Sequence, residues 1–341
     1  WDDALQESGS ASLFQSRIWS DWFRNHMGAR VIPLAAVNRK GTWKGLLLIT
    51  VEGAMSRRFL HKPLIQELFR AFLPQASWIY GPVPFRPKDS VAVHAAFAGY
   101  LSNAAWQGMQ LSGQTCPNIQ EDRIEIRQYQ SRGFLTQPWG TYVLDLRKSD
   151  DDMLADMKPA ARKAIRKANR DRLSVRRANC LSDVKSYWDL IVTVRKERKQ
   201  AYPPFSHWRD VWTVLHRRGI AEIFLAYQRG TLLSGLGIWR FGNRLYEFGS
   251  NQSSESVRNK LYGNDLIKWE VMRWGRDRGA EFYDLMGCPP PGIGTPKEQN
   301  IARFKRKFGG RYVPYVILNR PGNSPAHRVV GMVRTIRSHH Q

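Results

Sequence analysis

The chain has 341 residues, 42% of them hydrophobic and 12% aromatic, and a formal charge of +24. This composition excludes a disordered or fibrous chain, and the length predicts two domains at about 150 residues each. No apolar run approaches the roughly 18 residues that cross a bilayer, so no membrane span is expected. Cys116, Cys180 and Cys288 have no metal-ligand spacing, so neither a metal site nor a disulfide framework is expected. Together with a start that lacks the features of a signal peptide, the cysteine usage predicts a cytoplasmic protein.

The first half of the chain predicts three strands, a helix and a further strand. The first strand should run over residues 29–37, and a second, after a turn at Arg39-Lys40-Gly41, should end at residue 51. An apolar run at 77–83, a helix at 89–107 and a short strand at 109–112 follow.

The second half repeats this order. Alternating strands at 222–227, 232–240 and 245–249 are separated by the turn dipeptides Arg229-Gly230 and Gly242-Asn243. A helix is indicated by four residues at helical spacing: Tyr262, Leu266, Trp269 and Met272. That helix should stop by Gly279, and a strand follows at 281–286.

This shared order, with little residue identity, indicates a duplicated fold. We place the domain boundary near Pro138-Trp139-Gly140, with a first domain at 1–140 and a second at 141–317. The tail at about 318–341 is either a helix that returns to the first domain or a loose end.

The positive charge is concentrated in the second half. Residues 1–140 hold 15 Lys or Arg and 10 Asp or Glu, so 19 of the 24 net positive charges fall on residues 141–341. Clustered cations favour a polyanionic partner, because phosphate contacts release counterions. The alternative is charge that serves solubility alone.

The densest cluster is expected on a helix. Lys158, Arg162, Arg166 and Arg170 recur at every fourth residue, with Lys163 and Lys167 beside them. Like charges at this spacing repel one another, which a phosphate-bearing partner would offset. The stripe is therefore predicted to bind a phosphate-bearing partner, and a solvated face is the alternative for each residue alone.

A second cluster covers residues 303–310 and places cations beside aromatics and a glycine pair. We interpret it as a loop that can hold a charged side chain in a pocket. Lys305, between Phe304 and Arg306, is a candidate to stabilise an oxyanion during acyl transfer, while an ordinary surface lysine is the alternative. Arg303, Arg306 and Lys307 extend the predicted set of polyanion-binding residues.

Several other chemistries lack their motifs. The sequence has no GxxxxGK[ST] loop, no GxGxxG after a strand, no HExxH and no GxSxG. Nucleotide hydrolysis, dinucleotide redox chemistry, metalloprotease and serine hydrolase activities are therefore not indicated.

Motifs in chain order resemble the Fem family of aminoacyl-tRNA-dependent peptidyltransferases. In the first half these are Phe14-Gln15-Ser16 with Trp19, and Tyr80-Gly81-Pro82-Val83. The similarity is greater from Thr141 to Gly310, where its motifs are the basic helix, Leu245-Tyr246-Glu247-Phe248-Gly249-Ser250, Leu261-Tyr262, Trp269-Glu270, Phe282-Tyr283-Asp284-Leu285-Met286-Gly287, Phe304-Lys305 and Phe308-Gly309-Gly310.

The resemblance implies an α/β fold with mixed sheets, built from two tandem GNAT-like acyltransferase domains. It implies transfer of an amino acid from aminoacyl-tRNA to an amine of a peptidoglycan precursor, with no metal, cofactor or covalent intermediate. The acceptor would be a UDP-linked or lipid-linked muropeptide, and a lipid-linked one would bring the enzyme to the inner face of the membrane. The absence of a long heptad insertion predicts that there is no coiled-coil arm.

The resemblance also implies roles for individual residues. The polyanion that the cations of both clusters bind would be tRNA, so these cations are the predicted RNA-binding residues. Lys305 would stabilise the tetrahedral oxyanion or contact the terminal ribose of the tRNA, and Phe304 would pack beside it. The expected substrate-binding residues are Phe304, Tyr246, Ser250, Tyr262 and Trp212. Residues 207–212 depart from the family, since relatives often place Arg and Tyr for the acceptor there.

Two other functions stay open. An acyl-CoA-dependent N-acyltransferase, in cell-envelope, polysaccharide or natural-product synthesis, would need a Gly-rich pyrophosphate turn before the second-half helix. The corresponding residues 253–263 contain one glycine, Gly263, which counts against coenzyme A. The third alternative is a nucleic-acid-binding module without catalysis.

Overall fold

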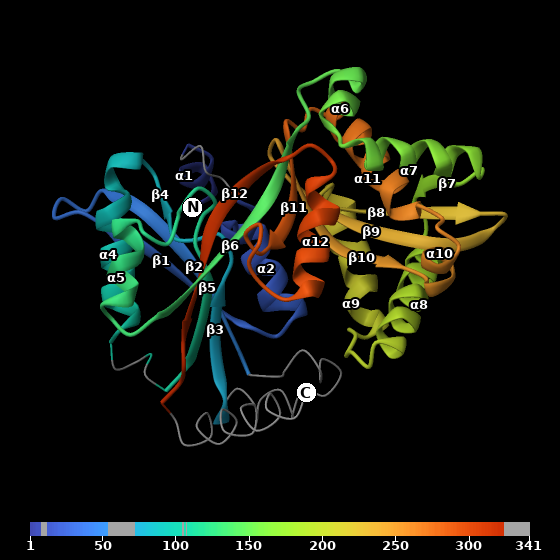
Figure 1. Cartoon of the computed structure of the whole chain (residues 1–341). Helices are drawn as coiled ribbons and strands as arrows, with labels where there is room; N and C mark the ends of the chain where they lie inside the picture. The colour runs from blue at the N-terminus through green and yellow to red at the C-terminus, as the bar shows by residue number, and fades with distance from the viewer. Residues whose placement is uncertain (8–11, 54–71, 104–105, 107, 324–341) are drawn as a thin grey trace. The chain divides into compact units, whose positions relative to one another are not determined.

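The protein is described from a computed structural model, which covers residues 1–7, 12–53, 72–103, 106 and 108–323 (Figure 1). The chain divides into two compact units. Unit 1 is Trp1–Trp139 together with Pro314–Gln341, and unit 2 is Gly140–Val313. The predicted fate of the tail beyond residue 323 lies outside the described residues.

Unit 1 is built on a mixed sheet. The sheet has the order β1-β2-β3-β5-β12, with β4 paired to β2. Its strands are β1 (Arg30–Val37), β2 (Trp43–Gly53), β3 (Pro74–Trp78), β4 (Val83–Pro84), β5 (Gln110–Gln114) and β12 (Arg311–Arg320). Its described helices are α1 (Asp2–Glu7), η1 (Leu13–Gln15), α2 (Arg17–His26), η3 (Pro87–Asp89), α4 (Ser90–Leu101) and α5 (Ile124–Gln130). β3 and β5 are parallel, and the other pairs are antiparallel.

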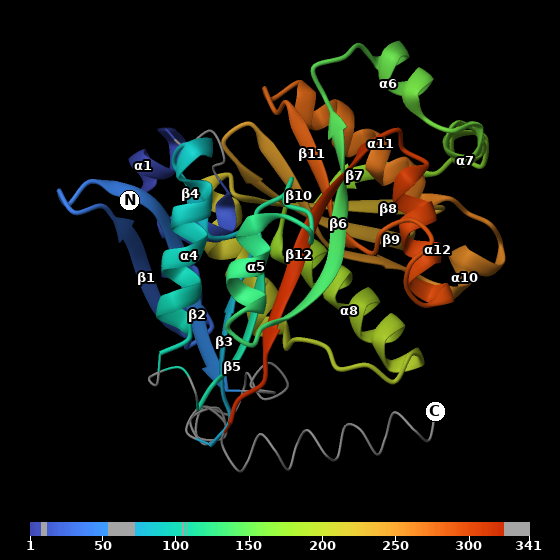
Figure 2. The same ribbon diagram turned by 60° about the vertical axis from the view of Figure 1, so that its left-hand side comes forward.

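The core of unit 1 lies between the sheet and the helices α4 and α5 (Figure 2). The helices contribute Val93, Phe97 and Ile126, which pack with Ile49 and Leu111 from the strands. Every one of these five side chains is buried. At about 25 cal/mol per Å² of apolar area, such burial supplies most of the favourable free energy of folding.

One predicted strand of unit 1 is wrong in its extent. The run 77–83 is not continuous, because Tyr80 has a left-handed φ of 51° that breaks the extended backbone. The residues before the break form β3, and those after it form β4, which pairs with β2. The predicted helix at 89–107 is shorter and ends at Leu101. Residues 104, 105 and 107 lie outside the described part of the chain.

Unit 2 has a mixed sheet of the order β6-β11-β10-β9-β8-β7. Its strands are β6 (Leu135–Asp145), β7 (Ser174–Arg177), β8 (Ala221–Gln228), β9 (Thr231–Phe241), β10 (Arg244–Gln252) and β11 (Phe282–Cys288). Its helices are α6 (Asp150–Asp156), α7 (Pro159–Arg170), α8 (Leu181–Glu197), α9 (Phe205–Asp210), η5 (Val211–Leu215), η6 (His216–Arg218), α10 (Ser254–Arg258), α11 (Gly263–Arg276) and α12 (Pro296–Arg306).

Helices cover both faces of the sheet in unit 2. α7 and α11 lie on one face, and α8 and α9 lie on the other (Figure 1). β8 shows the consequence, since its first six residues are all buried. Phe224 and Ala226 enter the core under α7 and α11, while Ile223 and Leu225 enter the core under α8 and α9. This alternation follows from the two-residue period of a strand.

The predicted loop at 303–310 is wrong for its first four residues. Arg303 to Arg306 form the last turn of α12, which Thr295 and Glu298 begin with a reciprocal capping box and Pro296 at its first position. Only the residues after Arg306 leave the helix. The prediction took the glycine pair at 309–310 as the sign of a loop. It did not use the helix cap that lies eight residues before Arg303.

The described helices are short. α8, with 17 residues, is the longest of them, so no coiled-coil arm extends from the described part of the chain. Within the same residues, no helix combines the length and the apolar character that a membrane span requires.

Candidate active site

The candidate site of unit 2 lies where two parallel strands separate. β10 and β11 pair only over Arg244–Tyr246 and Phe282–Asp284. Beyond these residues both strands change register against their outer neighbours, β10 after Phe248 and β11 after Asp284. The described residues of the two strands share no further pairing. Main-chain N–H and C=O groups beyond this point can therefore bond with groups outside the β10–β11 pair.

The irregularity of β11 is fixed by Asp284, which is buried. Its carboxylate accepts hydrogen bonds from the hydroxyl of Thr141 and, at 2.7 Å, from the main-chain N–H of Met286. These bonds hold Met286 at a left-handed φ of 60°, which an unbranched residue adopts only at a cost in free energy. The main chain at Met286 and Gly287 is thereby turned toward α12.

Lys305 reaches this bend from α12. Its Nζ donates hydrogen bonds to the main-chain oxygens of Met286, at 3.0 Å, and Gly287, at 2.9 Å. Burial lowers the pKa of Lys305, and the charge of Glu247 opposes that shift. An ammonium has three donors, so two of them are used in these contacts and the third can serve a reacting oxygen.

A buried ion pair lies beside this ammonium, and the sequence analysis missed it. Lys268 of α11 pairs with Glu247 of β10, and the hydroxyl of Tyr283 donates to the same carboxylate oxygen at 3.2 Å. The side chain of Lys268 is 1% exposed and that of Glu247 is 9% exposed. Helical spacing could have shown that Lys268 lies on the core face of its helix, because it precedes the predicted core residue Met272 by four positions.

Phe304 lies over a second ion pair. Lys307 Nζ is 2.5 Å from Asp265 Oδ1 and 4.2 Å from the centre of the Phe304 ring. Phe304 and Phe308 pack edge to face with their centres 5.4 Å apart. Burial raises the pKa of Asp265, and Lys307 opposes that shift. Lys307, a predicted RNA-binding residue, is thus directed inward in the structure.

The other predicted substrate-binding residues are dispersed. Tyr246 is buried and Ser250 is exposed, although both belong to β10. Tyr262 packs against the same core as Phe304. Trp212 stacks on His216 with ring centres 3.6 Å apart and packs against the core under α8 and α9. The structure therefore brings Tyr262 and Phe304 to one face of the sheet and places Trp212 on the other.

The predicted RNA-binding helix is α7, and its cations divide into two groups. Arg162 donates to the main-chain oxygens of Leu154, Ala155 and Met157, and Lys167 pairs with Asp171. The remaining cations of the helix are exposed: Lys158, Lys163, Arg166 and Arg170. Arg303 and Arg306 are also exposed. The main-chain N–H of Lys158 donates to the oxygen of Lys307 at 2.9 Å, so the start of α7 and the end of α12 are joined.

Cys288 is a neighbour of Lys305 but is poorly suited to be a nucleophile. Burial raises the pKa of its thiol to about 11, and the ammonium of Lys305 opposes that shift. The thiolate, which is the reactive form, is therefore scarce near neutral pH.

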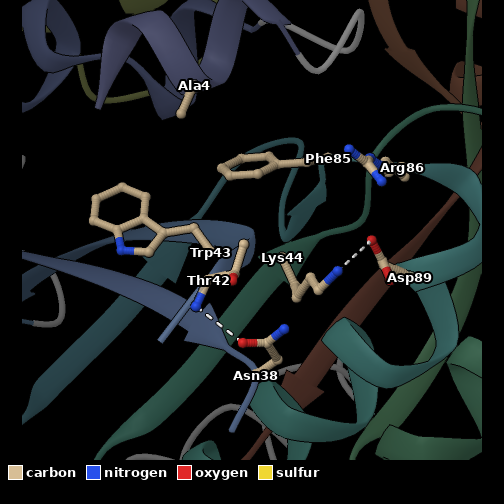
Figure 3. A pocket seen from close by; sticks show the side chains of 8 residues that line it. All are labelled: Ala4, Asn38, Thr42, Trp43, Lys44, Phe85, Arg86 and Asp89. Carbon is tan, nitrogen blue, oxygen red and sulfur yellow. Dashed lines mark hydrogen bonds and ion pairs between the residues drawn. The ribbon is translucent and has the colours of Figure 1, made fainter. Parts of the chain in front are cut away.

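Unit 1 has a separate cavity of about 630 Å³. Figure 3 shows the rings of Trp43 and Phe85 on one side of it and the pair of Lys44 and Asp89, 3.6 Å apart, on the other. None of the residues that line it is a predicted site residue. In unit 2, a groove of about 330 Å³ is lined by arginines of β7 and α11, and Arg176 and Arg177 there are paired with Asp183 and Glu222.

Residues 156–306 match the protein-family model described as an acetyltransferase (GNAT) domain. No curated protein matches the sequence. Among solved structures, FemX is similar with a TM-score of 0.68 and 14% identity, over 92% of this chain and 94% of that chain. A tandem GNAT protein from the clavulanic acid biosynthesis pathway has a TM-score of 0.56 and 13% identity, over 94% of this chain and 93% of that chain. L-PGS from Bacillus licheniformis has a TM-score of 0.51 and 10% identity, over 91% and 89% of the two chains.

These findings define the class of the protein. The match to the acetyltransferase (GNAT) domain model lies within unit 2, and the protein is an acyltransferase. The predicted α/β fold of two tandem GNAT-like units is confirmed, since FemX and the tandem GNAT protein share the fold over more than nine-tenths of the chain.

Proposed function

We propose that the protein is an aminoacyltransferase of the Fem type, which moves an amino acid from aminoacyl-tRNA to an amine of a peptidoglycan precursor. The observation that carries the proposal is the position of Lys305, whose ammonium is held at the bend of β11 where β10 and β11 separate. The similarity of fold to FemX supports it.

The chemistry needs only positioning and charge. The acceptor amine adds to the ester carbonyl of the aminoacyl-tRNA, and the carbonyl oxygen becomes an oxyanion that the Lys305 ammonium stabilises. The ester bond then breaks, the terminal ribose leaves with a proton, and an amide bond remains. One oxyanion donor is typically worth about 10² to 10³ in rate, and correct placement of two reactants supplies much of the rest.

The cationic surface of α7 supports a tRNA donor. Lys163, Arg166 and Arg170 are exposed on the helix, which packs against α11. The Nζ of Lys167 lies 5.9 Å from the ring of Tyr262, the residue before α11. Exposed cations that are grouped on one helix can each neutralise a phosphate. We assign the predicted RNA-binding role to the exposed members and a structural role to Arg162, Lys167 and Lys307.

The acceptor is proposed to be a stem peptide on a UDP-linked or a lipid-linked precursor. In the second case the exposed cations of unit 2 would also meet anionic headgroups at the inner face of the membrane. Tyr262 and Phe304 are the substrate-binding residues that the geometry supports. Both pack against the core that also contains Leu285 and Cys288 of β11, the strand whose bend Lys305 contacts.

Transfer from an acyl-CoA is the second candidate, and the family description as an acetyltransferase favours it. The start of α11, where a GNAT enzyme would bind pyrophosphate, counts against it. The first turn of α11 contains Asp265, a buried acidic residue that already has Lys307 as its partner. A carboxylate at a helix N-terminus competes with a bound diphosphate for the same partial positive charge.

Mass spectrometry of a reaction with mixed aminoacyl-tRNAs, acyl-CoAs and wall precursors tests the proposal. We expect loss of the amino acid from a tRNA and a matching mass increase in the muropeptide. Consumption of an acyl-CoA with every charged tRNA left intact would overturn the tRNA-dependent function and favour the second candidate.

A further inference from the structure

The ion pair between Lys268 and Glu247 is unusual in its burial. Both side chains are at least nine-tenths covered, and Tyr283, which shares the carboxylate, is fully buried. A buried ion pair often contributes little net stability, because the desolvation of two charges offsets their attraction. A contribution to stability is therefore a weak explanation for this ion pair. Its position beside Lys305 suggests a role in the site.

Glu247 stands at the point where the two strands separate. It follows Tyr246, the last residue of β10 that pairs with β11. Lys305 approaches the same point from α12 through its hydrogen bonds to Met286 and Gly287. The charge of Glu247 favours the ammonium form of Lys305, and the charge of Lys268 disfavours it.

The local charges balance only when all of them are present. Lys268 and Lys305 supply two ammonium groups, and Glu247 and Asp284 supply two carboxylates. If Glu247 became neutral, two buried ammonium groups would share one carboxylate. Lys305 would then release its proton more readily, because nearby like charge and burial both disfavour the charged form.

We propose that Glu247, fixed by Lys268 and Tyr283, is a positioning residue that keeps the amine of Lys305 in its ammonium form at the bend of β11. The inference rests on the proposed role of Lys305 as the oxyanion stabiliser. Glu247 acts through Lys305, and its Oε2 is held by both Lys268 and Tyr283.

Among the described residues, other ionisable groups also surround Lys305. They come from each packed element: Glu247 from β10, Asp284 and Cys288 from β11, Lys268 from α11, and Arg306 and Lys307 next along the chain from Lys305 itself. Cys288 is a neutral thiol near pH 7, and Lys307 is paired with Asp265. Glu247 is thus the group whose neutralisation changes the balance without breaking the bend that Asp284 holds.

The test compares the pH dependence of kcat/KM in four proteins: wild type, Glu247→Gln, Lys268→Met and the double variant. In the wild type, kcat/KM should fall at alkaline pH as Lys305 loses its proton. In Glu247→Gln, this fall should begin about one pH unit lower, so that kcat/KM on the falling limb is about tenfold below that of the wild type. The plateau at lower pH should be retained. Lys268→Met should show no such shift, because it removes the charge that opposes the Lys305 ammonium. The double variant should lie closest to the wild type.

A second readout does not depend on activity. Brief labelling with acetic anhydride at a series of pH values, followed by mass spectrometry of the peptide that contains Lys305, reports the fraction of unprotonated amine. In Glu247→Gln, the labelling of Lys305 should begin at a lower pH than it does in the wild type. If this shift occurs while no aminoacyl transfer is found, the inference stands and the proposed function fails.

Glu222→Gln is the matched control, because Glu222 is also a buried acid on a strand of the same sheet and is paired with Arg177. It should leave the labelling of Lys305 unchanged. An unshifted labelling curve in Glu247→Gln would overturn the inference, and so would equal shifts in Glu247→Gln and Lys268→Met. If Glu247→Gln does not fold, a curve for the double variant that is shifted from wild type by a full unit would also overturn it.

Discussion

The side-chain nitrogen of Lys305 lies 2.9 Å from the main-chain oxygen of Gly287, and this contact joins the end of α12 to the bend of β11. Most of α12 and the loop before it lie between the two residues in the sequence. The bend depends on Asp284 and Thr141, which belong to neighbouring strands. Three segments of unit 2 therefore determine where this single ammonium is held.

Replacement of Lys305 tests its catalytic role. Lys305→Ala should lower kcat by about 10² to 10³, because an oxyanion donor is lost, while the Kd for charged tRNA should stay within a few fold. Arg306→Ala, a change at an exposed residue next along the chain, is the control and should retain kcat. Wild-type turnover in Lys305→Ala would remove the catalytic assignment.

The exposed cations of α7 should set the salt dependence of tRNA binding. Charge reversal at Lys163 and Arg166 should weaken binding and reduce the slope of log K against log salt by about 2, one for each lost phosphate contact. Reversal of Lys196 and Arg198, exposed at the end of α8 on the other face of the sheet, is the control. If the two double variants have equal slopes, α7 is only a solvated surface.

The stability of unit 1 should fall in mild acid because of His94. Burial lowers the pKa of this histidine from 6.5 to about 4, and among the described residues neither ring nitrogen has a hydrogen-bond partner. The folded state thus favours the neutral ring. Its contribution is complete above pH 6.5 and is lost as the pH falls toward 4, by about 3 kcal/mol over that range.

Urea denaturation of the wild type and His94→Phe at pH 7.5 and pH 4.5 measures this effect. The free energy of unfolding should fall less between the two pH values in the variant, by about 2 kcal/mol or more. Parallel pH dependence in the two proteins would show that the unfolded and folded states protonate His94 alike.

Gly309 should be required for the junction of α12 with the end of α6. It has a φ of +88°, and a Cβ there would lie 2.6 Å from the main-chain oxygen of Asp156. Gly292 has a similar φ of +83° but open space around it. Gly292→Ala should therefore cost about 1 kcal/mol from backbone strain, and Gly309→Ala roughly 1 to 3 kcal/mol more.

Thermal unfolding of the two alanine variants separates strain from steric conflict. The larger loss of Tm should belong to Gly309→Ala. Equal losses would mean that the end of α6 moves aside without cost, and that the turn after α12 does not hold the start of α7 in place.

Much of the architecture could be predicted from local patterns. The turn dipeptides Arg229-Gly230 and Gly242-Asn243 marked the hairpins of unit 2, and helical spacing marked α11. These features depend on residues that are close in sequence. The extent of β3 and β4 was missed because the left-handed backbone at Tyr80 has no glycine to signal it.

The candidate site was predicted less completely. Lys305 and Phe304 were proposed as site residues, but their setting at the end of a helix was not predicted. Arg162 and Lys167 were placed with the RNA-binding cations, although local carbonyls and Asp171 engage them. Charge counts do not distinguish a cation that is paired from one that is exposed, because pairing depends on the direction of each side chain.

The sequence by itself determined the duplicated order of strands and helices, the uneven charge and the candidacy of one lysine. All of these follow from hydrophobic period, turn chemistry and residue type, which act over a few neighbouring residues. Only the tertiary structure brought Glu247, Lys268 and Lys305 together, from a strand and two helices that lie 21 to 58 residues apart in the chain. Their burial makes the contact matter for stability and protonation, because charges removed from water must be balanced by nearby opposite charges.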